Sequence, residues 1–445
     1  MNRPRTLLAM LVAALMLAAL PAQAQTAPSA TPPSDDIHLG VATCAGSTCH
    51  GNTAGVKKTG VLQNEYLTWQ RLDKHAKAFT VLQGELGKRI ARNLGLPSAE
   101  TAEVCLNCHA DNVPAAKRGV QFQLSDGVGC EACHGGSQKW LGPHASGKIP
   151  HAQLVSDYGI VATDDPMTRA KLCVSCHVGS GDRFVTHRIM GAGHPRMPFE
   201  LETFTQIEPA HYQIDDIYKK RKTVAAGVQF WAVGQAAALE TLMNSVQDPA
   251  HKGDGAFPEL VFFDCDSCHH PTTSLRWEKR ASSGLGPGLP HLNDANAIML
   301  RAIAARIDPA TGGELEKAVV SLHGAMAEGK GVSKTDAAAV GQIAHKLGLA
   351  FAAHTFTRDD MKAMMAALAA RGPAGDYADY AAAEQATMAF ASIVYTLKTD
   401  NLVDAGQAAK LKTALDGCYA ATQKEEAYEP AKFVAAAETV ARSLP

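Results

Sequence analysis

The stretch that decides the fold is CEACH at residues 130–134, where a histidine directly follows a Cys-x-x-Cys pair. Three more stretches repeat this pattern: CLNCH at 105–109, CVSCH at 173–177 and CDSCH at 265–269. A fifth stretch, CAGSTCH at 44–50, ends in the same way but has four residues between its cysteines. Ten of the eleven cysteines therefore belong to five short motifs, and Cys418 stands apart.

Closely spaced cysteines can form disulfides, bind zinc, act as a redox dithiol or attach haem c. The fivefold repetition with a following histidine decides between these four uses. Disulfides between such near neighbours would close very short loops and constrain the unfolded chain little. A zinc site would combine two pairs without requiring a histidine at a fixed position, and a redox dithiol would occur once, near a βαβ unit. Cys-x-x-Cys-His is instead the attachment pattern of haem c, and chance would place histidine after all four regular pairs on the order of once in a few hundred thousand trials. The four regular motifs are therefore predicted to carry haem c.

The spacing within the motif follows from helix geometry. Positions i, i+3 and i+4 share one face of a helix, so both thiols can reach the vinyl groups of one porphyrin while the histidine reaches its iron. Ahead of CVSCH, Asp165 is predicted to cap a helix whose first residue is Pro166. Ser98 is predicted to play the same role ahead of Cys105.

The wider motif cannot lie on a regular helix. Cys44 and Cys49 would be separated by about 140° around the helix axis, because each residue turns the chain by about 100°. Residues 45–48 are therefore expected to bulge, which Gly46 and the hydroxyls of Ser47 and Thr48 permit. We expect a fifth haem here. A disulfide or a haem held by one thioether remains the alternative, and a disulfide would leave four haems.

Each haem iron has two axial positions, and histidine is a common ligand in electron-transfer haems. The motif histidines are expected to be the proximal ligands, and five further histidines are sought for the opposite faces. The predicted thioether cysteines are Cys44, Cys49, Cys105, Cys108, Cys130, Cys133, Cys173, Cys176, Cys265 and Cys268, and the predicted proximal ligands are His50, His109, His134, His177 and His269.

Longer blocks of the sequence resemble the exported multihaem cytochromes c related to cytochrome c554. The blocks lie between Cys44 and Trp277 and include CAGSTCHG, LDKHAKAFTVL, CLNCH, GVGCEACHGGSQKWLGPH, CVSCHVGSGDRFVTHRIMGAGHPRMPFE, PAHYQID, RKTVAAGVQFWAVGQAAAL and FDCDSCHH. The resemblance implies a mainly α fold of helices and loops around stacked haems. It also implies the distal ligands, since members of the family carry histidine at the positions of His75, His144, His187, His194 and His211. We expect the remaining histidines of this region to be bystanders: His38, His151, His251, His270 and His291.

Composition divides the chain into four segments. Residues 1–24 indicate a secretory signal, with a positive start, an apolar run too short for the roughly 20 residues that span a bilayer, and AQA as a cleavage site. Residues 25–36 are rich in Pro, Ser and Thr and indicate a flexible leader. Residues 37–290 are expected to form the pentahaem cytochrome c domain, and 291–445 an α-helical C-terminal domain.

The C-terminal segment has no Cys-x-x-Cys pair and is rich in alanine. Thr357 and Asp360 have the spacing of a capping box, and Gly372-Pro373 is a stop signal. Between them Met361, Met364, Met365 and Leu368 lie on one face of the predicted helix. This pattern predicts a helical bundle, in which the lone Cys418 is expected to be buried and inert.

The net charge of the chain argues against nucleic acid as a partner. The whole chain has 42 basic and 44 acidic residues, and loss of Arg3 and Arg5 with the signal would leave 40 against 44. A chain with this balance lacks the positive excess typical of nucleic-acid binding. No stable membrane anchor is expected after signal cleavage.

The sequence therefore predicts a periplasmic carrier of single electrons, with redox proteins as donors and acceptors. Two alternatives remain. If His144 or His211 is not a ligand, one open haem iron could act on a small nitrogen-oxide-type ligand. The helical C-terminal segment could instead dock the chain onto a larger redox complex. Resemblance argues against the known pentahaem nitrite reductases, which carry lysine in place of one proximal histidine, because this chain has no Cys-x-x-Cys-Lys.

Overall fold

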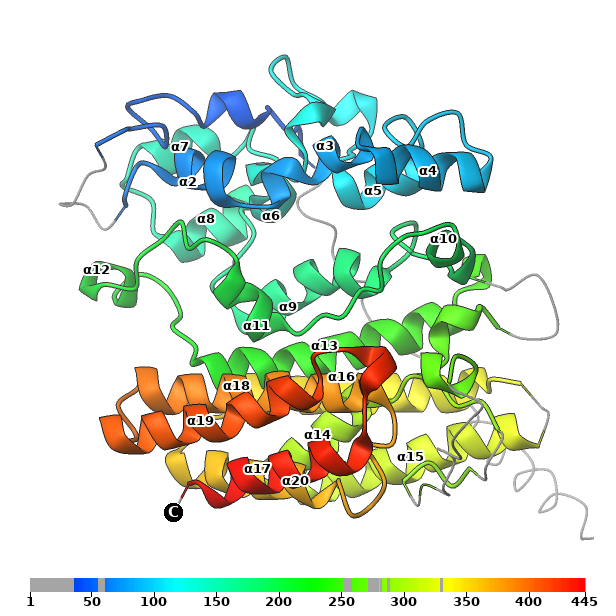
Figure 1. The fold of residues 1–445 in the computed structure, drawn as a ribbon. Coiled ribbons are helices and arrows are strands. Elements are labelled where there is room, and N and C mark those ends of the chain that lie inside the picture. The colour runs from blue at the N-terminus through cyan, green and yellow to red at the C-terminus, as the bar shows by residue number, and fades with distance from the viewer. Residues whose placement is uncertain are drawn as a thin grey trace, which may run out of the picture. The chain divides into compact units, whose positions relative to one another are not determined.

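Helices account for nearly all of the regular structure (Figure 1). A computed structural model describes residues 36–54, 61–251, 258–270, 280, 282–285, 289–328 and 331–444. Within these residues the helices are joined by loops, with three isolated β-bridges and no named strand. The mainly α fold expected from the sequence is confirmed. The signal at 1–24 and nearly all of the leader at 25–36 lie outside the described residues.

The helices before residue 220 are short, because motif turns and loops interrupt them. Asp165 caps α9 as predicted, since its carboxylate accepts a hydrogen bond from the Thr168 amide at 2.8 Å and Pro166 is the first residue. The prediction for Ser98 was wrong: α5 begins at Glu103, and the Ser98 hydroxyl contacts that of Thr101 at 3.1 Å instead. The bounds are α2 Glu65–Leu72, α3 Ala78–Leu82, α4 Glu85–Leu94, α5 Glu103–His109, α6 Cys130–His134, α7 Leu141–Ala145, α8 His151–Tyr158, α9 Pro166–Val174, α10 His187–Gly191, α11 Leu201–Ile207 and α12 Asp216–Lys219.

The later helices are long and form the expected bundle. In α17 the Thr357 and Asp360 side chains each accept the other residue's backbone amide, so the predicted capping box is confirmed. The four apolar residues of its predicted face are fully buried, and the helix ends just before Gly372. The bounds are α13 Gly227–Gln247, α14 Ala295–Ile307, α15 Pro309–Ala327, α16 Lys334–Ala353, α17 Arg358–Ala370, α18 Tyr380–Thr399, α19 Ala405–Ala421 and α20 Pro430–Arg442.

One large apolar cluster, formed by buried residues from Ala170 to Leu444, holds these helices together. Its centre is α13, which packs most extensively against α16 and also against α9, α11, α14 and α18. The α13 and α16 backbones approach closely because Gly348 faces Ala236, where an added Cβ would lie 3.1 Å from the alanine methyl. By sequence α13 belongs to the expected haem domain, and it shares a core with the expected C-terminal domain. The division near residue 290 stays a prediction.

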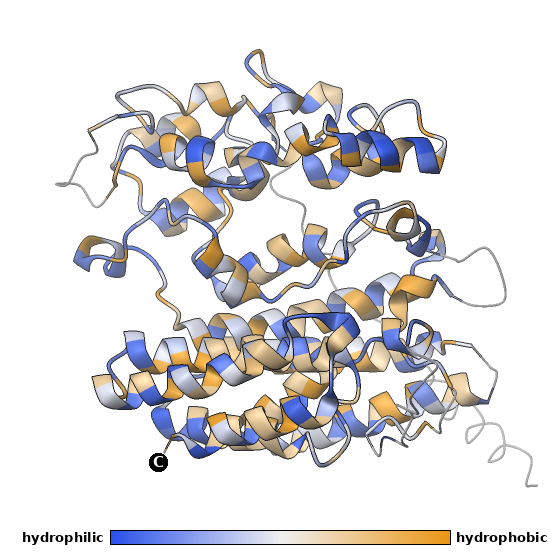
Figure 2. Ribbon diagram, in the orientation of Figure 1, coloured by the Kyte–Doolittle hydropathy of each residue, from blue (hydrophilic) through white to orange (hydrophobic). Residues whose placement is uncertain are grey.

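The first part of the chain has a much smaller apolar core. Its cluster contains five buried residues, from the last residue of α3 to the residue that follows α5: Leu82, Ala91, Ala99, Leu106 and Ala110. Figure 2 shows the same contrast in colour, with α4 largely hydrophilic and the bundle helices mainly apolar or neutral. The cysteine motifs and the distal candidates lie mostly in this part of the chain and in the loops that connect it to α13.

Candidate functional site

All eleven cysteines are free thiols in the structure, so none of the close pairs forms a disulfide. Cys418 on α19 is fully buried, as expected, and burial raises the pKa of its thiol to about 12. The five motifs are called attachment sites 1 to 5 in chain order, from Cys44–His50 at site 1 to Cys265–His269 at site 5.

The regular motifs adopt more than one local conformation. At sites 2 and 3 the motif lies within an α-helix, α5 and α6 respectively, as the spacing predicts. At site 4 Cys173 lies in the last turn of α9, while Cys176 and His177 lie in a π-helical turn, Ser175–Gly179. There the Ser175 hydroxyl donates to the Leu172 carbonyl at 2.7 Å, and such bonds compete with the helical ladder. At site 5 the motif begins in a 3₁₀ turn, Cys265–Ser267.

Site 1 bulges as predicted. The Cys49 amide donates to the Gly46 carbonyl at 2.9 Å and the His50 amide to the Cys44 carbonyl at 3.2 Å, so the chain turns back on itself between the two thiols. The loop is tight, because a Cβ on Gly51 would lie 2.0 Å from the Ala45 carbonyl oxygen. Cys44 is buried and Cys49 is exposed.

The histidines of the motifs and the distal candidates lie in pairs. Every motif histidine has one distal candidate beside it, and no candidate serves two sites. The five pairs and the distances between their ring centres are His50–His144 at 5.9 Å, His109–His194 at 6.4 Å, His134–His211 at 6.3 Å, His177–His75 at 6.2 Å and His269–His187 at 6.1 Å.

These distances fit two imidazoles on opposite faces of one iron. A metal–imidazole bond is about 2.0–2.1 Å and the ring centre lies about 1.2 Å beyond the nitrogen, so the two centres should be about 6.4 Å apart. Two imidazoles joined by a hydrogen bond would be closer, with centres about 5.3 Å apart. The five pairs therefore have the separation that haem c with two histidine ligands requires, and the cysteines of each site lie in the adjoining turn.

The ring nitrogens point to the same arrangement. In four of the ten rings a protein oxygen contacts Nδ1, which leaves Nε2 for the iron and fixes the orientation of the ring. The four contacts are His50 with Glu65 at 2.9 Å, His75 with Asp73 at 3.1 Å, His109 with the Ala78 carbonyl at 2.8 Å and His194 with the Pro195 carbonyl at 2.8 Å.

Burial keeps several of these imidazoles neutral, as metal ligation requires. Burial lowers the pKa of His134 to about 3, with smaller contributions from His211 and other cations nearby. Burial and the neighbouring His75 likewise lower the pKa of His177 to about 4. The hydrogen bond that His50 donates to Glu65 raises the pKa of His50 against the effect of burial, and Asp73 acts on His75 in the same way.

Neighbouring thiols give the spatial order of the sites, which the sequence does not reveal. The neighbouring thiols of Cys44 at site 1 and Cys130 at site 3 shift each other's pKa, that of Cys44 downward and that of Cys130 upward. Cys176 of site 4 and Cys108 of site 2 form a second pair of this kind. The pKa of Cys133 at site 3 is raised by burial and then by Cys173 of site 4, which places those sites together. His187, the candidate for site 5, is the first residue of α10, and His194, the candidate for site 2, lies three residues beyond its last residue, Gly191. The order is therefore 1–3–4–2–5.

The expected bystander histidines lie among other partners. His38 contacts Asp111 at 2.7 Å, and His251 contacts the Gly181 carbonyl at 2.7 Å while stacking on Phe184. The other three contact an acidic side chain or a carbonyl: His151 with Asp164, His270 with the Asp266 carbonyl and His291 with Asp379.

Sequence reasoning missed the residues that support the ligands. Glu65 and Asp73 contact His50 and His75, and Phe199 stacks on His177 with ring centres 4.6 Å apart. Only Asp73 carries a sequence signal, because it lies two positions before a candidate ligand. Glu65 and Phe199 are distant in sequence from the histidines they contact.

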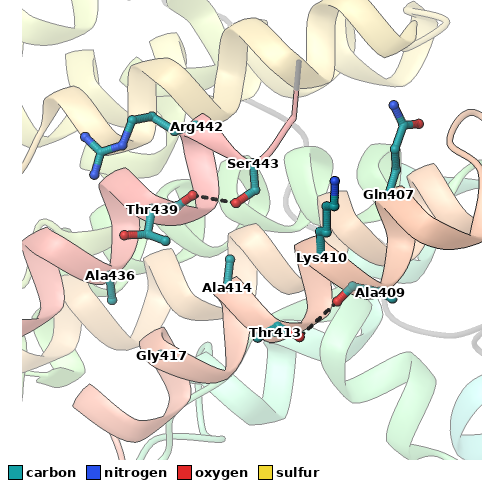
Figure 3. A pocket seen from close by; sticks show the side chains of 10 residues that line it. All are labelled: Gln407, Ala409, Lys410, Thr413, Ala414, Gly417, Ala436, Thr439, Arg442 and Ser443. Atoms are coloured by element: carbon teal, nitrogen blue, oxygen red, sulfur yellow. Dashed lines mark hydrogen bonds between the residues drawn. The ribbon is translucent and has the colours of Figure 1, made fainter.

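A groove of about 870 Å³ lies elsewhere, between α19 and α20 (Figure 3). Two of its hydroxyls donate hydrogen bonds to backbone carbonyls one turn earlier: Thr413 to Ala409 and Ser443 to Thr439. Lys410 and Arg442 lie at its edge, and none of its lining residues belongs to a histidine pair. The groove offers no converging polar groups and has no part in the candidate site.

Comparison with known proteins agrees with the geometry. Residues 43–135 match the family model described as cytochrome c554 and c-prime, and this segment contains attachment sites 1, 2 and 3. No curated protein and no solved structure matches the chain. Among the described helices, none is both long enough and apolar enough to cross a membrane. Over residues 43–135 the chain is thus similar to the cytochrome c554 and c-prime family.

Proposed function

We propose that the protein is a pentahaem cytochrome c that transfers single electrons through five covalently attached haems, each with two histidine ligands. The observation that carries the proposal is the set of five histidine pairs, each 5.9–6.4 Å between ring centres. Within the described residues, no proximal histidine lacks a distal candidate.

Haem c supplies the redox chemistry by cycling between ferric and ferrous iron. The chain's own residues fix the ligands and control the surroundings. The cysteines tether each cofactor, the Nδ1 contacts orient the imidazoles, and burial around His134 and His177 keeps the rings neutral and water away.

The order of the sites supports a route with two ends. The thiol of Cys49 at site 1 is exposed, as are those of Cys265 and Cys268 at site 5, whereas the thiols of sites 2, 3 and 4 are partly buried. We propose that redox proteins donate and accept electrons at these two ends. No nucleic acid is expected as a partner.

Export is also part of the proposal. Attachment of haem c through thioethers and the signal at residues 1–24 both favour a periplasmic location, with the signal removed. The wider motif of site 1 is proposed to carry the fifth haem, because His50 has the same kind of partner as the other four proximal histidines.

The small-ligand alternative loses support from the same pairs. It depends on His144 or His211 being absent from the iron, and these two lie beside His50 and His134. No feature of the described residues favours the docking alternative either, since the groove between α19 and α20 has no converging polar groups.

A reductive titration tests the proposal. The purified wild-type protein should take up five electrons per chain reversibly, and carbon monoxide should not change the spectrum of the reduced protein. His144→Ala is the matched control, because it frees one face of site 1 and should create a carbon monoxide band. A band of that kind in the wild type, or fewer than five electrons per chain, would contradict the proposal.

A further inference from the structure

Helix α2 connects two attachment sites through its two ends. Its first residue, Glu65, contacts Nδ1 of His50 at 2.9 Å, and His50 is the proximal ligand of site 1. The residue after its last turn, Asp73, contacts Nδ1 of His75 at 3.1 Å, and His75 is the distal candidate of site 4. One short helix therefore places a carboxylate behind one ligand at each of two sites.

Both carboxylates are held in place by backbone amides. One Glu65 oxygen accepts from Leu62 and Gln63 at 3.0 and 3.1 Å, which leaves the other oxygen for His50. The Asp73 oxygen that contacts the imidazole also accepts from the His75 amide at 2.9 Å. The two carboxylate side chains are only 16% and 6% exposed, against 29% and 39% for the imidazoles of His50 and His75, so water screens each contact little from the carboxylate side. Each carboxylate is therefore held beside the imidazole of one histidine, and its charge acts on that ring.

Site 2 provides the contrast within the same molecule. Both of its histidines, His109 and His194, contact a backbone carbonyl through Nδ1. A carbonyl is a neutral acceptor, whereas a carboxylate draws the Nδ1 proton more strongly and makes the imidazole a more basic ligand. A more basic ligand, with a negative charge behind it, favours ferric over ferrous iron and so lowers the reduction potential.

We propose that Glu65 and Asp73 are positioning residues that lower the reduction potentials of the haems at sites 1 and 4. The inference rests on the proposed function, because it requires His50 and His75 to be iron ligands. In the order 1–3–4–2–5 the two carboxylate-supported sites are the first and the third. The potential along the route is then uneven, and the haem of site 2 lies above that of site 4.

Asp73→Asn is the cleaner test. The asparagine oxygen can still accept from both the His75 amide and Nδ1, so the substitution removes the charge and keeps the contacts. We expect the ratio of oxidised to reduced haem at site 4, measured at a fixed solution potential, to fall about tenfold, which corresponds to a rise of about 59 mV for a one-electron couple. Glu65→Gln should shift site 1 in the same direction.

The control removes the same charge without touching a histidine. Glu103 is exposed and is the first residue of α5, as Glu65 is of α2. Glu103→Gln should leave the reduction potentials of all the haems unchanged. The ratio of oxidised to reduced haem at each site should then stay within a few-fold of its wild-type value. Electron paramagnetic resonance separates two classes of site, because this angle changes the low-spin spectrum. The paired rings lie 13° and 29° apart at sites 1 and 5, and 81°, 88° and 81° apart at sites 2, 3 and 4, so Glu65→Gln should shift the first class and Asp73→Asn the second.

The outcomes separate the inference from the proposed function. Five low-spin haems in the wild type, with no upward shift in Asp73→Asn or Glu65→Gln, would overturn the inference and leave the function standing. Fewer than five haems in the wild type would contradict the function itself. If one of the two variants does not fold, the other still decides, because each acts on a different site.

Discussion

Residues 36–160 and the bundle of α13 to α20 are held together by different means. The bundle has long helices around one large apolar cluster, with side chains such as Trp231, Phe351 and Phe390 fully buried. Residues 36–160 have short helices and an apolar cluster of five residues. Ordering a residue's backbone costs about 1–2 kcal/mol, so a stretch of this length needs much more burial than that cluster supplies.

The difference indicates that the proposed haems would act as core in the first part of the chain. Its histidines and thiols, which would be poor core residues alone, lie where porphyrins would cover them. A group that binds the folded state alone stabilises that state, and covalent attachment makes its effective concentration very high. We therefore expect the stability of the first part, and not that of the bundle, to depend on haem.

The largest effect should come from removing a central haem. Cys130→Ala with Cys133→Ala eliminates both thioethers of site 3, which lies between sites 1 and 4. Limited proteolysis with mass spectrometry should then show rapid cleavage within residues 36–160, while α13 to α20 stay protected. Equal loss of protection in the bundle would show that the two regions depend on haem alike.

A core substitution in the bundle should have the opposite pattern. Phe390 of α18 is fully buried, and Phe390→Ala should lower the free energy of unfolding by about 3–5 kcal/mol through cavity formation. Haem content should stay at the wild-type value. Tyr395 on the same helix is 44% exposed, so Tyr395→Ala is the control and should cost far less. Denaturant titration of the helical signal measures both, and a loss of haem in Phe390→Ala would break the proposed separation.

A smaller effect should appear as acid sensitivity of the bundle. Burial alone would raise the pKa of Asp294, but the Arg280 guanidinium paired with it holds that pKa at about 2, below the ordinary value of 3.8. A depressed folded-state pKa stabilises the protein above the unfolded value, and this stabilisation is lost as pH falls from about 4 to about 2. The loss should be on the order of 2 kcal/mol in the free energy of unfolding.

The substitution Asp294→Asn isolates that contribution. The midpoint of denaturant unfolding is measured between about pH 6 and about pH 2, because this range spans the carboxylate pKa values. As the pH falls, the midpoint should decrease less steeply in the variant than in the wild type. Parallel curves for the two proteins would show that this ion pair does not set the acid response.

Local signals in the sequence predicted local structure well. The motif cysteines, the bulge at site 1, the cap at Asp165 and the capping box of α17 all depend on residues a few positions apart. Ser98 failed because its hydroxyl found Thr101 instead of a helix amide, a choice that propensity alone does not decide. The turn at site 4 departs from α-helix for a similarly local reason, the bond from the Ser175 hydroxyl to the Leu172 carbonyl.

The pairing of the histidines, the residues that support them and the packing of the helices depend on contacts between residues that are distant in sequence. The five distal candidates came from family resemblance, but which of them faces which motif follows only from the folded chain. The same holds for Glu65 behind His50, for Phe199 on His177 and for the packing of α13 against α16. Periodicity shows which face of a helix is apolar, and it does not show which partner covers that face.

The central claim is five haems with two histidine ligands each, and one sample tests it. Pyridine haemochrome analysis against the intact mass of the wild-type chain gives the haem number, and electron paramagnetic resonance of the same oxidised sample gives the spin states. The account predicts five haems per chain and low-spin iron throughout. Four haems, or a high-spin ferric signal in the intact protein, would contradict it.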